Sequence, residues 1–389
     1  MDTFFENELA LLKEQGLLRD LYPLPETGGE ITVGGKTVIN FSSNDYLDLS
    51  RDQRLKSAAI RAIEQLGCGS SASRLMSGHL EMHEELESDL ARMMGTEAAL
   101  VFGSGYLTNL GVLTSFAHRG DEIFADRLNH ASLIDGARLS RAHISPYRHR
   151  DLDHLEELLE TTKVTGKRVI VSDSVFSMDG DIAPLAGLAE LAGRYEALLV
   201  IDEAHAIGVI GKNGGGHCRV AGKEVRPDIV IGTLSKALGG YGGFAACSES
   251  VRDFLINNAR SFIYSTGLPP ACLGSGREAV AIVESNPGLG ETLLKKTGRF
   301  RELLVRAGLK APEVQSPILP IIVGSNEKAV RFSQLLQEQG LLIRAVRPPS
   351  VPAGESRVRL SLTLALADDT LEQSAERIAE TAANMGLIS

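Results

Sequence analysis

The sequence lacks long hydrophobic runs and low-complexity tracts and has only four cysteines, and each shortage excludes a class of protein. A membrane-spanning helix needs about 20 predominantly apolar residues, whereas apolar runs such as ALLVI (197–201) are far shorter. The N-terminal segment MDTFFENELALLKEQ carries acids where a secretion signal carries positive charge. The scattered cysteines contain no CxxC pair, which disfavours a disulfide framework and a zinc site. We therefore expect a cytoplasmic protein with reduced thiols, no membrane segment and no metal.

Positive charge is also in short supply. The chain has 40 Lys and Arg against 50 Asp and Glu, a formal net charge of −10. Nonspecific nucleic-acid binding relies on a basic surface, so this balance disfavours a nucleic-acid partner. The segment RLSRAHISPYRHR (138–150) is locally basic, and we expect it to be a solvated helix end and strand edge rather than a ligand site.

The alternation of apolar and amphipathic segments predicts the fold class. With 389 residues, the chain exceeds one ordinary compact core. Between residue 97 and about residue 250, several short apolar runs are separated by amphipathic stretches. Continuous apolar strands joined by helices predict a largely parallel sheet covered on both faces, an α/β fold. The runs are AALVF, DEIFA, KRVIV, ALLVID, DIVIG and GGFAA.

Flanking segments suggest how the chain divides. In the preceding helix HLEMHEELESDLARMMG, we expect Leu86, Leu90 and Met93 or Met94 to face the core. SNPGLG (285–290) is a plausible joint, followed by a helix at 291–307, a second βα run, and a last helix opened by Asp369 with Glu372 in a capping-box-like arrangement. We predict an N-terminal helix and strands (1–45), a large domain (46–285) and a small C-terminal α+β domain (286–389).

Lys236 is the first residue that suggests chemistry. In VIGTLSKALGG (230–240) it occupies a small, Gly- and Ser-containing turn directly after a buried strand. An ammonium group is costly there unless it is paired or covalently used. The competing interpretation is a lysine whose head group simply reaches the surface.

Asp202 stands at the carboxyl end of the apolar strand in ALLVIDEAHAIG (197–208), where open α/β sheets place their ligand crevice. A buried carboxylate at that place needs a cationic partner, and a pyridinium nitrogen is one. His205 follows three residues later, close enough to reach another substituent of the same ring. Asp-x-x-His alone also fits a metal site or a capped helix, but a downstream strand-end lysine makes the combination more specific.

The segment ALVFGSGYLTN (99–109) predicts a phosphate site, because an apolar strand runs through Gly103, Ser104 and Gly105 into an amphipathic helix. A dinucleotide fingerprint requires a third glycine, and that position holds Thr108. GKNGGGH (211–217) is no P-loop, because its lysine precedes the glycines.

With these segments in place, the chain resembles the α-oxoamine synthases, a family of fold-type I enzymes that use pyridoxal 5'-phosphate (PLP). The resemblance runs nearly end to end, and within the family the segment RPPSVPAGESRVRLSLT (347–363) is most similar to members that condense L-alanine with a pimeloyl thioester in biotin biosynthesis. The matching motifs are FSSNDYL (41–47), GSSASRLMSGHLEMHEELE (69–87), FGSGY (102–106), NHAS (129–132), VFSMDGD (175–181), IDEAHAIG (201–208), GTLSKALGG (232–240) and YSTGLPP (264–270).

The resemblance implies a role for each matching residue. Lys236 would hold PLP as a Schiff base and act as the catalytic base, Asp202 would pair with the ring nitrogen, and His130 would stack over the ring as a catalytic and substrate-binding residue. The further cofactor residues would be Ser104, Gly105, Tyr106, Ser177, His205 and Thr233, with Ser265 and Thr266 contributed by the neighbouring subunit of a homodimer. The substrate-binding residues would be Asn44 and Arg359 for the amino-acid carboxylate and Arg19 and Ser350 for the acyl group.

Two positions depart from the family pattern, and several alternatives stay open. Asp48 stands where glycine is usual, and its charged side chain puts the family's turn at this position in doubt. Ser350 stands where threonine is commoner. His130 as an ordinary core histidine and Arg19 as an ordinary exposed arginine are the competing interpretations. Condensation of glycine with acetyl-coenzyme A is the alternative activity, and an NAD-binding oxidoreductase is the alternative class. The acyl donor is either a coenzyme A thioester or an acyl-carrier-protein thioester.

Overall fold

The computed structural model describes residues 2–220 and 222–388. Contacts divide the chain into two compact units. The larger unit comprises Leu47–Ser177 and Asp181–Glu291, and the smaller unit comprises Met1–Tyr46, Met178–Gly180 and Thr292–Ser389. Residues 1–45, predicted as a separate N-terminal part, are grouped with the C-terminal part in the structure, because strand β2 (Lys36–Asn40) pairs with β11 (Leu341–Leu342).

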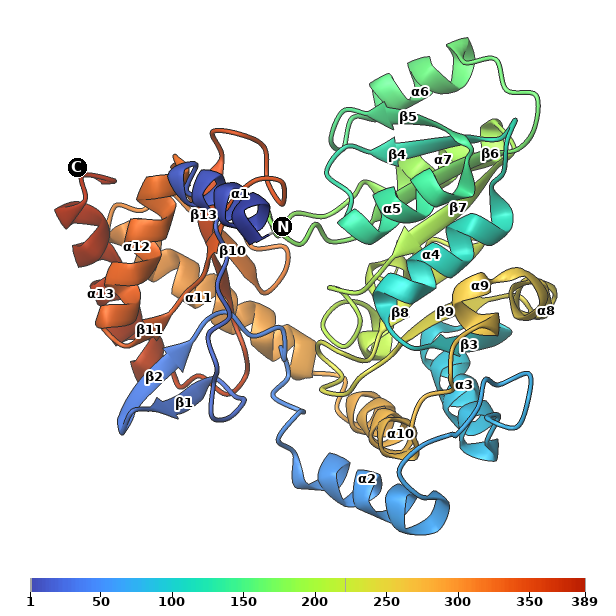
Figure 1. The fold of residues 1–389 in the computed structure, drawn as a ribbon, viewed down its shortest axis with the longest axis horizontal. Coiled ribbons are helices and arrows are strands. Elements are labelled where there is room, and N and C mark those ends of the chain that lie inside the picture. Colours follow the sequence, from blue (N-terminus) through green and yellow to red (C-terminus); the bar gives the residue numbers. More distant parts are fainter. Residues whose placement is uncertain (1, 221, 389) are drawn as a thin grey trace. The chain divides into compact units, whose positions relative to one another are not determined.

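A seven-stranded sheet forms the centre of the larger unit (Figure 1). Its order is β3-β9-β8-β7-β6-β4-β5, and the pairs from β8 through β7, β6 and β4 to β5 are parallel. Strand β9 runs antiparallel to both β3 and β8. The strands are β3 (Ala98–Phe102), β4 (Glu122–Asp126), β5 (His143–Tyr147), β6 (Arg168–Asp173), β7 (Ala197–Asp202), β8 (Ile229–Thr233) and β9 (Gly243–Cys247).

Alternate strand residues enter two hydrophobic cores, one on each face of the sheet. Val169 and Val171 belong to the first core, and Ile170 between them belongs to the second. This burial on both faces explains why the strands read as continuous apolar runs. The predicted α/β fold is confirmed. Strand β5 lies within segment 138–150, where the sequence predicted a helix end and a strand edge, but it was not among the apolar runs, because HISPY contains a proline and polar residues and the strand lies at the sheet edge.

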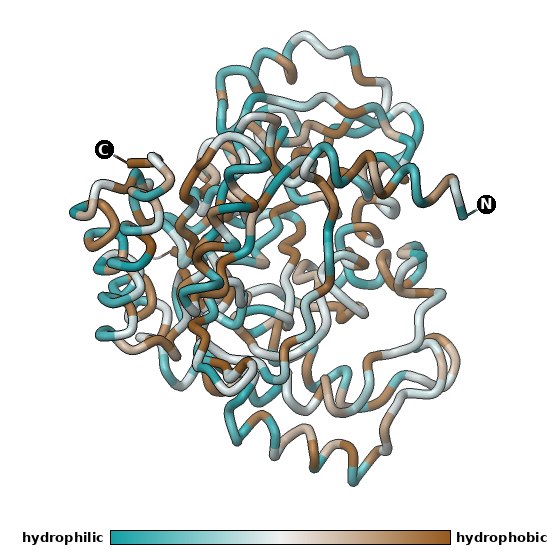
Figure 2. Tube along the Cα trace, turned by 60° about the vertical axis from the view of Figure 1, so that its left-hand side comes forward, coloured by the Kyte–Doolittle hydropathy of each residue, from teal (hydrophilic) through white to brown (hydrophobic). Residues whose placement is uncertain are grey.

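Helices surround the sheet of the larger unit (Figure 1), and hydrophilic and hydrophobic residues are interspersed along the helical turns of the chain (Figure 2). In α3, the predicted core residues Leu86, Leu90, Met93 and Met94 are all buried. The helices are α2 (Gln53–Leu66), α3 (Glu81–Met94), α4 (Gly105–Phe116), α5 (Ala131–Ser140), α6 (Leu152–Thr161), α7 (Leu185–Arg194), α8 (Glu249–Asn258), α9 (Arg260–Ile263) and α10 (Pro270–Ser285), with 3-10 turns η1 (Lys212–Gly214) and η2 (His217–Arg219).

The smaller unit contains two three-stranded sheets, ordered β1-β2-β11 and β10-β13-β12. Gly34 and Gly35 connect β1 to β2, and both have positive φ, as a tight hairpin turn requires. The elements are α1 (Asp2–Glu14), β1 (Glu30–Val33), β2, most of α11 (Leu289–Arg306), β10 (Ile318–Gly324), α12 (Asn326–Glu338), β11, β12 (Ala345–Val346), β13 (Ser356–Ser361) and α13 (Asp368–Asn384).

The predicted capping box of the last helix is wrong. Helix α13 begins at Asp368, so Asp369 lies inside the first turn, and the N-cap residue Ala367 makes no side-chain cap. An acidic residue in a first turn still complements the helix dipole. Glu372 instead pairs with Arg299 of α11 at 2.9 Å.

Asp48 adopts a left-handed backbone with φ of 57°. That conformation explains why the family pattern has glycine at this position, and aspartate is one of the few other residues that tolerates it.

Among the residues that the structure describes, no helix combines the length and apolar character needed to cross a membrane.

Candidate active site

Buried carboxylates gather where the parallel strands of the larger unit end. Asp126, Asp173 and Asp202 are the last residues of β4, β6 and β7, and all three are buried. Asp173 and Asp202 are register partners on adjacent strands, so their side chains leave the sheet on the same face. Burial and the neighbouring Asp202 raise the pKa of Asp173 well above its usual range. A cation is the partner that relieves such crowding.

Neutral donors orient the Asp202 carboxylate. Its Oδ1 accepts the backbone N–H of Ala204 at 2.9 Å, and its Oδ2 accepts the side-chain amide of Asn109 at 2.7 Å. Both donors are neutral, so neither of them brings a positive charge to the carboxylate. A protonated ring nitrogen is a suitable partner for a carboxylate held in this way.

A chain of hydrogen bonds links Asp202 to His130. The Asn109 amide also donates to Ser132 Oγ at 2.8 Å, and Ser132 Oγ lies 2.7 Å from His130 Nδ1. The Ser132 backbone N–H donates to Nδ1 at 3.3 Å, so Nδ1 is an acceptor and the Ser132 hydroxyl donates to it. The network therefore assigns the proton of the neutral imidazole to Nε2.

The protonation of His130 depends on the charges around it. Desolvation of the imidazole and the nearby Lys236 ammonium lower the pKa of His130 below 6.5, and Asp202 opposes them. The His130 backbone N–H donates to Asp173 Oδ2 at 2.7 Å. Lys236 itself is half-buried in the turn after β8. The predicted residues Lys236, His130 and Asp202 thus lie close enough to affect one another electrostatically.

The first turn of α4, where the sequence predicts a phosphate site, lies beside the end of β8. Ser104 is the N-cap, and its hydroxyl accepts the N–H of Leu107 at 3.2 Å. A Cβ on Gly105 would lie 3.5 Å from Thr233 Cβ, and a Cβ on Gly243 would lie 2.4 Å from Gly105 N. The close approach explains the glycine at 243, whereas a Cβ at position 105 would be at an ordinary contact distance. The N–H groups that open a helix have no intrahelical partner and favour a phosphate.

The other predicted cofactor residues vary in placement. His205 is buried three residues after Asp202, Ser177 is half-buried after Phe176, and Tyr106 is exposed with its hydroxyl donating to Asp135 at 2.7 Å. The groups at this edge, a helix N-terminus beside Thr233 and a buried carboxylate near a lysine, fit the phosphate, ring nitrogen and aldehyde of PLP, and the Thr233 hydroxyl donates to the Gly242 carbonyl at 2.8 Å.

Ser265 and Thr266 lie between α9 and α10. Thr266 forms a β-bridge with Ser73, and the N–H of Gly267 donates to the Ala72 carbonyl at 3.0 Å. Their backbone is therefore tied to the GSSASR segment. Their role toward a neighbouring subunit's phosphate stays a prediction.

The smaller unit brings together Arg359 and Asn44, which are 315 residues apart in the sequence. The Arg359 guanidinium donates to Asn44 Oδ1, to Ser361 Oγ at 2.9 Å and to the Tyr46 hydroxyl at 3.5 Å. Burial raises the pKa of Tyr46 to about 12, so its hydroxyl stays neutral. Arg359 Nε is buried and has no hydrogen-bond partner among the described residues. A positive group with neutral partners and an unused donor suits a carboxylate.

Arg357, two residues earlier on the same face of β13, behaves differently. Its side chain is fully buried and pairs with Asp179 and Glu355. Because its charge is matched by acids, we interpret Arg357 as a structural residue.

Arg19 and Ser350 are both exposed. Arg19 donates to the Pro348 carbonyl at 3.2 Å, and the Ser350 N–H donates to the Arg347 carbonyl at 3.1 Å. The structure thus places Arg19 beside the 347–350 turn.

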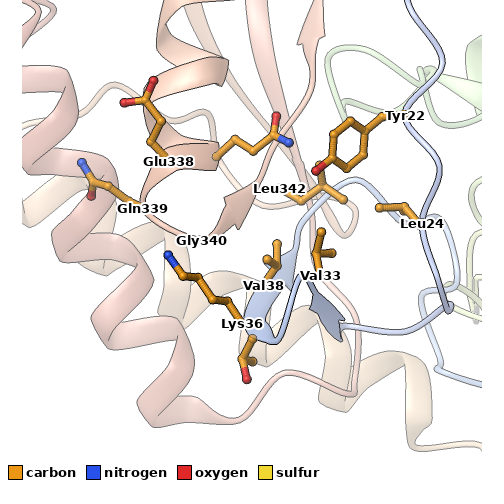
Figure 3. Close-up of a pocket in the computed structure, with 11 residues that line it drawn as sticks. Tyr22, Leu24, Val33, Lys36, Val38, Glu338, Gln339, Gly340 and Leu342 are labelled. Carbon is orange, nitrogen blue, oxygen red and sulfur yellow. The ribbon is translucent and has the colours of Figure 1, made fainter.

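A cavity of about 400 Å³ in this unit is lined by Tyr22, Lys36, Leu342 and their neighbours, and none of the predicted site residues lines it (Figure 3).

Sequence reasoning missed Asn109, Ser132 and Asp173. Asp173 ends a buried parallel strand, as Asp202 does, so the same rule would have found it. Ser132 lies inside the NHAS motif, and Asn109 is a buried polar residue on α4. No sequence signal shows that these two side chains contact each other.

The comparisons with known proteins agree with this geometry. Residues 36–378 match the family model described as aminotransferase class I and II. The chain belongs to this family. It is 43% identical over 390 residues to 8-amino-7-oxononanoate synthase of Lysinibacillus sphaericus and 44% identical over 391 residues to that of Geobacter sulfurreducens, covering 100% of both chains in each case.

Solved structures give the same result. Serine palmitoyltransferase of Sphingomonas wittichii has a TM-score of 0.92 at 30% identity, covering 100% of this chain and 98% of that one. A serine palmitoyltransferase variant of S. paucimobilis with a bound PLP–myriocin aldimine has a TM-score of 0.93 at 27% identity, covering 99% and 98%. 8-Amino-7-oxononanoate synthase of Francisella tularensis has a TM-score of 0.77 at 29% identity, covering 90% and 99%. The predicted family, fold type and cofactor are confirmed.

Breaking the hydrogen-bond chain at its two links should have graded effects. Asn109→Leu removes both bonds, whereas Ser132→Ala removes the link to His130 and leaves the Asn109–Asp202 bond. A hydrogen bond to a charged group contributes about 1.5–3 kcal/mol, so we expect kcat to fall about 10–100-fold in Asn109→Leu and less in Ser132→Ala. The check is steady-state kinetics with bound PLP measured by absorbance. Equal activity of Asn109→Leu and the parent enzyme would contradict a catalytic role for these hydrogen bonds.

Proposed function

We propose that the protein condenses L-alanine with a pimeloyl thioester to give 8-amino-7-oxononanoate, carbon dioxide and a free thiol, a step of biotin biosynthesis. The observation that carries the proposal is full-length identity of 43–44% to relatives of that name. The cluster of Asp202, His130 and Lys236 at the carboxyl edge of the sheet supports it, because this is where an α/β sheet holds its ligand.

PLP, when bound, supplies an electron sink for the negative charge that develops when the amino acid loses its α-proton. Asp202, oriented by Asn109 and Ala204, holds the proton on the ring nitrogen. The Lys236 amine would be the base that takes the α-proton. Arg359 and Asn44 bind the amino-acid carboxylate through the guanidinium fork.

His130 contributes a neutral ring. Its lowered pKa keeps it uncharged at neutral pH, and the Ser132 contacts leave Nε2–H as its outward donor. A neutral imidazole can cover a ring face without competing with the ring nitrogen for the negative charge of Asp202. The Ser104–Tyr106 turn, beside Thr233, would hold the phosphate.

Replacing the substrates one at a time tests the proposed reaction. Turnover should be measured with L-alanine and with glycine, each against pimeloyl-coenzyme A, a pimeloyl-carrier protein and acetyl-coenzyme A. We expect L-alanine with a pimeloyl thioester to give the highest kcat/KM. Preference for glycine with acetyl-coenzyme A would overturn the proposal in favour of the alternative condensation. Tight NAD binding without release of a thiol would favour the oxidoreductase class.

We also propose a homodimer in which Ser265 and Thr266 serve the phosphate of the partner's site. A Lys236→Ala chain mixed with a Ser265→Ala/Thr266→Ala chain yields hybrid dimers in which one site is intact and the other carries all the changes. Activity should partly return once subunits exchange. Verified hybrids without recovery above either parent variant, with both folded, would mean that these residues act within their own subunit.

A further inference from the structure

His149 occupies a charged cluster that the roles above do not use. It follows β5, and its Nδ1 lies 3.0 and 3.2 Å from the two Asp126 carboxylate oxygens, while Nε2 lies 2.9 Å from Asp181 Oδ2. Both ring nitrogens face carboxylates, and only the imidazolium form donates from both. The ring also packs edge-to-face on Phe176, with centroids 4.4 Å apart.

Asp126 organises the turn that leads to His130. Its carboxylate accepts the N–H groups of Leu128 at 2.9 Å and of Arg150 at 2.8 Å, and its backbone carbonyl accepts the N–H of Asn129 at 3.1 Å. The turn between β4 and α5 is therefore built around this carboxylate. His130 is the N-cap of α5 and directly follows that turn.

Asp181 closes the loop that carries Ser177. Its backbone carbonyl accepts the N–H of Phe176 at 3.0 Å, and its carboxylate also pairs with Arg150 at 2.8 Å. His149 therefore contacts both segments. It contacts Asp126 in the turn before His130, and it contacts Asp181 and Phe176 in the loop that carries Ser177.

We propose that His149 is a positioning residue whose imidazolium joins Asp126 to Asp181 and so holds the His130 turn and the Ser177 loop together for the cofactor. The assignment of His130 and Ser177 to the cofactor rests on the proposed function, whereas the contacts of His149 do not. The basic segment 138–150 thus serves the site through its last residues, although its exposed part, including Arg138 and Arg141, is the solvated helix end expected from the sequence.

The groups around His149 predict a pH dependence. Asp126 from the end of β4, Asp181 from the following loop and Arg150 from its own segment are the charged groups that face it. Desolvation lowers the pKa of His149, but hydrogen bonds with Asp126 and Asp181 outweigh it and raise the pKa to about 9. His149 is therefore an imidazolium at neutral pH. Its charged link between Asp126 and Asp181 is lost as the pH rises through about 9.

The test compares His149→Gln with His143→Gln. Glutamine cannot donate to two opposed carboxylates and carries no charge. His143 is a matched control, because its Nδ1 also pairs with a carboxylate, Glu122 at 2.7 Å, but at the other end of β4. The measurements are the PLP dissociation constant of the apoprotein and the absorption spectrum of bound PLP from pH 7 to 10.5, with the unfolding midpoint recorded for each variant.

We expect PLP affinity of His149→Gln to be about tenfold weaker at pH 7.5, equivalent to one hydrogen bond to a charged group, and to converge with the parent above pH 9. His143→Gln should match the parent at every pH. Unchanged PLP affinity in a destabilised His149→Gln would show a merely structural role and overturn the inference. If His149→Gln does not fold, the parent protein alone still tests the inference. A PLP affinity of the parent that does not change up to pH 10 would overturn it. The outcome is separate from the proposed function, because PLP affinity is measured without either substrate.

Discussion

Lys236→Ala should reduce product formation from L-alanine and a pimeloyl thioester to a kcat at least about 1,000-fold below that of the parent enzyme. The reason is that one amine both holds the cofactor and takes the α-proton, and a positioned acid–base group alone contributes about 10²–10⁴-fold. Steady-state thiol release measures the effect.

Lys212→Ala is the matched control for this variant. Lys212 is an exposed lysine in the loop after β7 of the same unit, and its loss should leave activity within twofold of the parent. Retention of more than a tenth of the activity by folded Lys236→Ala would contradict the assignment of Lys236.

Asp202→Asn should keep much of the bound PLP but lose exchange of the alanine α-proton by about 100-fold or more. A neutral amide cannot hold the ring nitrogen protonated, so the developing negative charge is no longer stabilised electrostatically. Solvent deuterium exchange at the α-carbon, followed by NMR without acyl donor, isolates this step from the condensation.

Asp228→Asn controls for the loss of a carboxylate on the same strands. Asp228 precedes β8 and accepts the N–H of Leu199 on β7 at 2.8 Å, at the opposite end of the strand pair from Asp202. Its replacement should leave exchange unchanged. Near-normal exchange in Asp202→Asn would show that Asp202 has another role.

The strand ends were predictable because burial leaves a strong local pattern. A run such as ALLVID reads as a buried strand, and its terminal carboxylate stands out against apolar neighbours. The same reasoning located Lys236 and the Ser104–Gly105 turn. Strand β5 gave no such signal, because an edge strand is not buried on both faces.

Side-chain contacts between residues far apart in the sequence could not be predicted from the local sequence pattern. Asn109, Ser132 and His130 come from two helices and a turn, and only the packing of α4 beside α5 aligns their side chains. Arg359 and Asn44 were found through the family resemblance alone, since nothing in either segment signals the other. His149 was assigned to a solvated segment because its two carboxylate partners lie 23 and 32 residues away in the sequence.

The central claim is that PLP is attached to Lys236, and reductive trapping tests it most directly. Borohydride treatment of the purified enzyme fixes the cofactor on its lysine, and mass spectrometry of the digest locates the pyridoxyl group. The account predicts a single labelled peptide that contains Lys236 in the segment GTLSKALGG. A pyridoxyl group on any other lysine, or none on a protein that carries bound PLP, would contradict it.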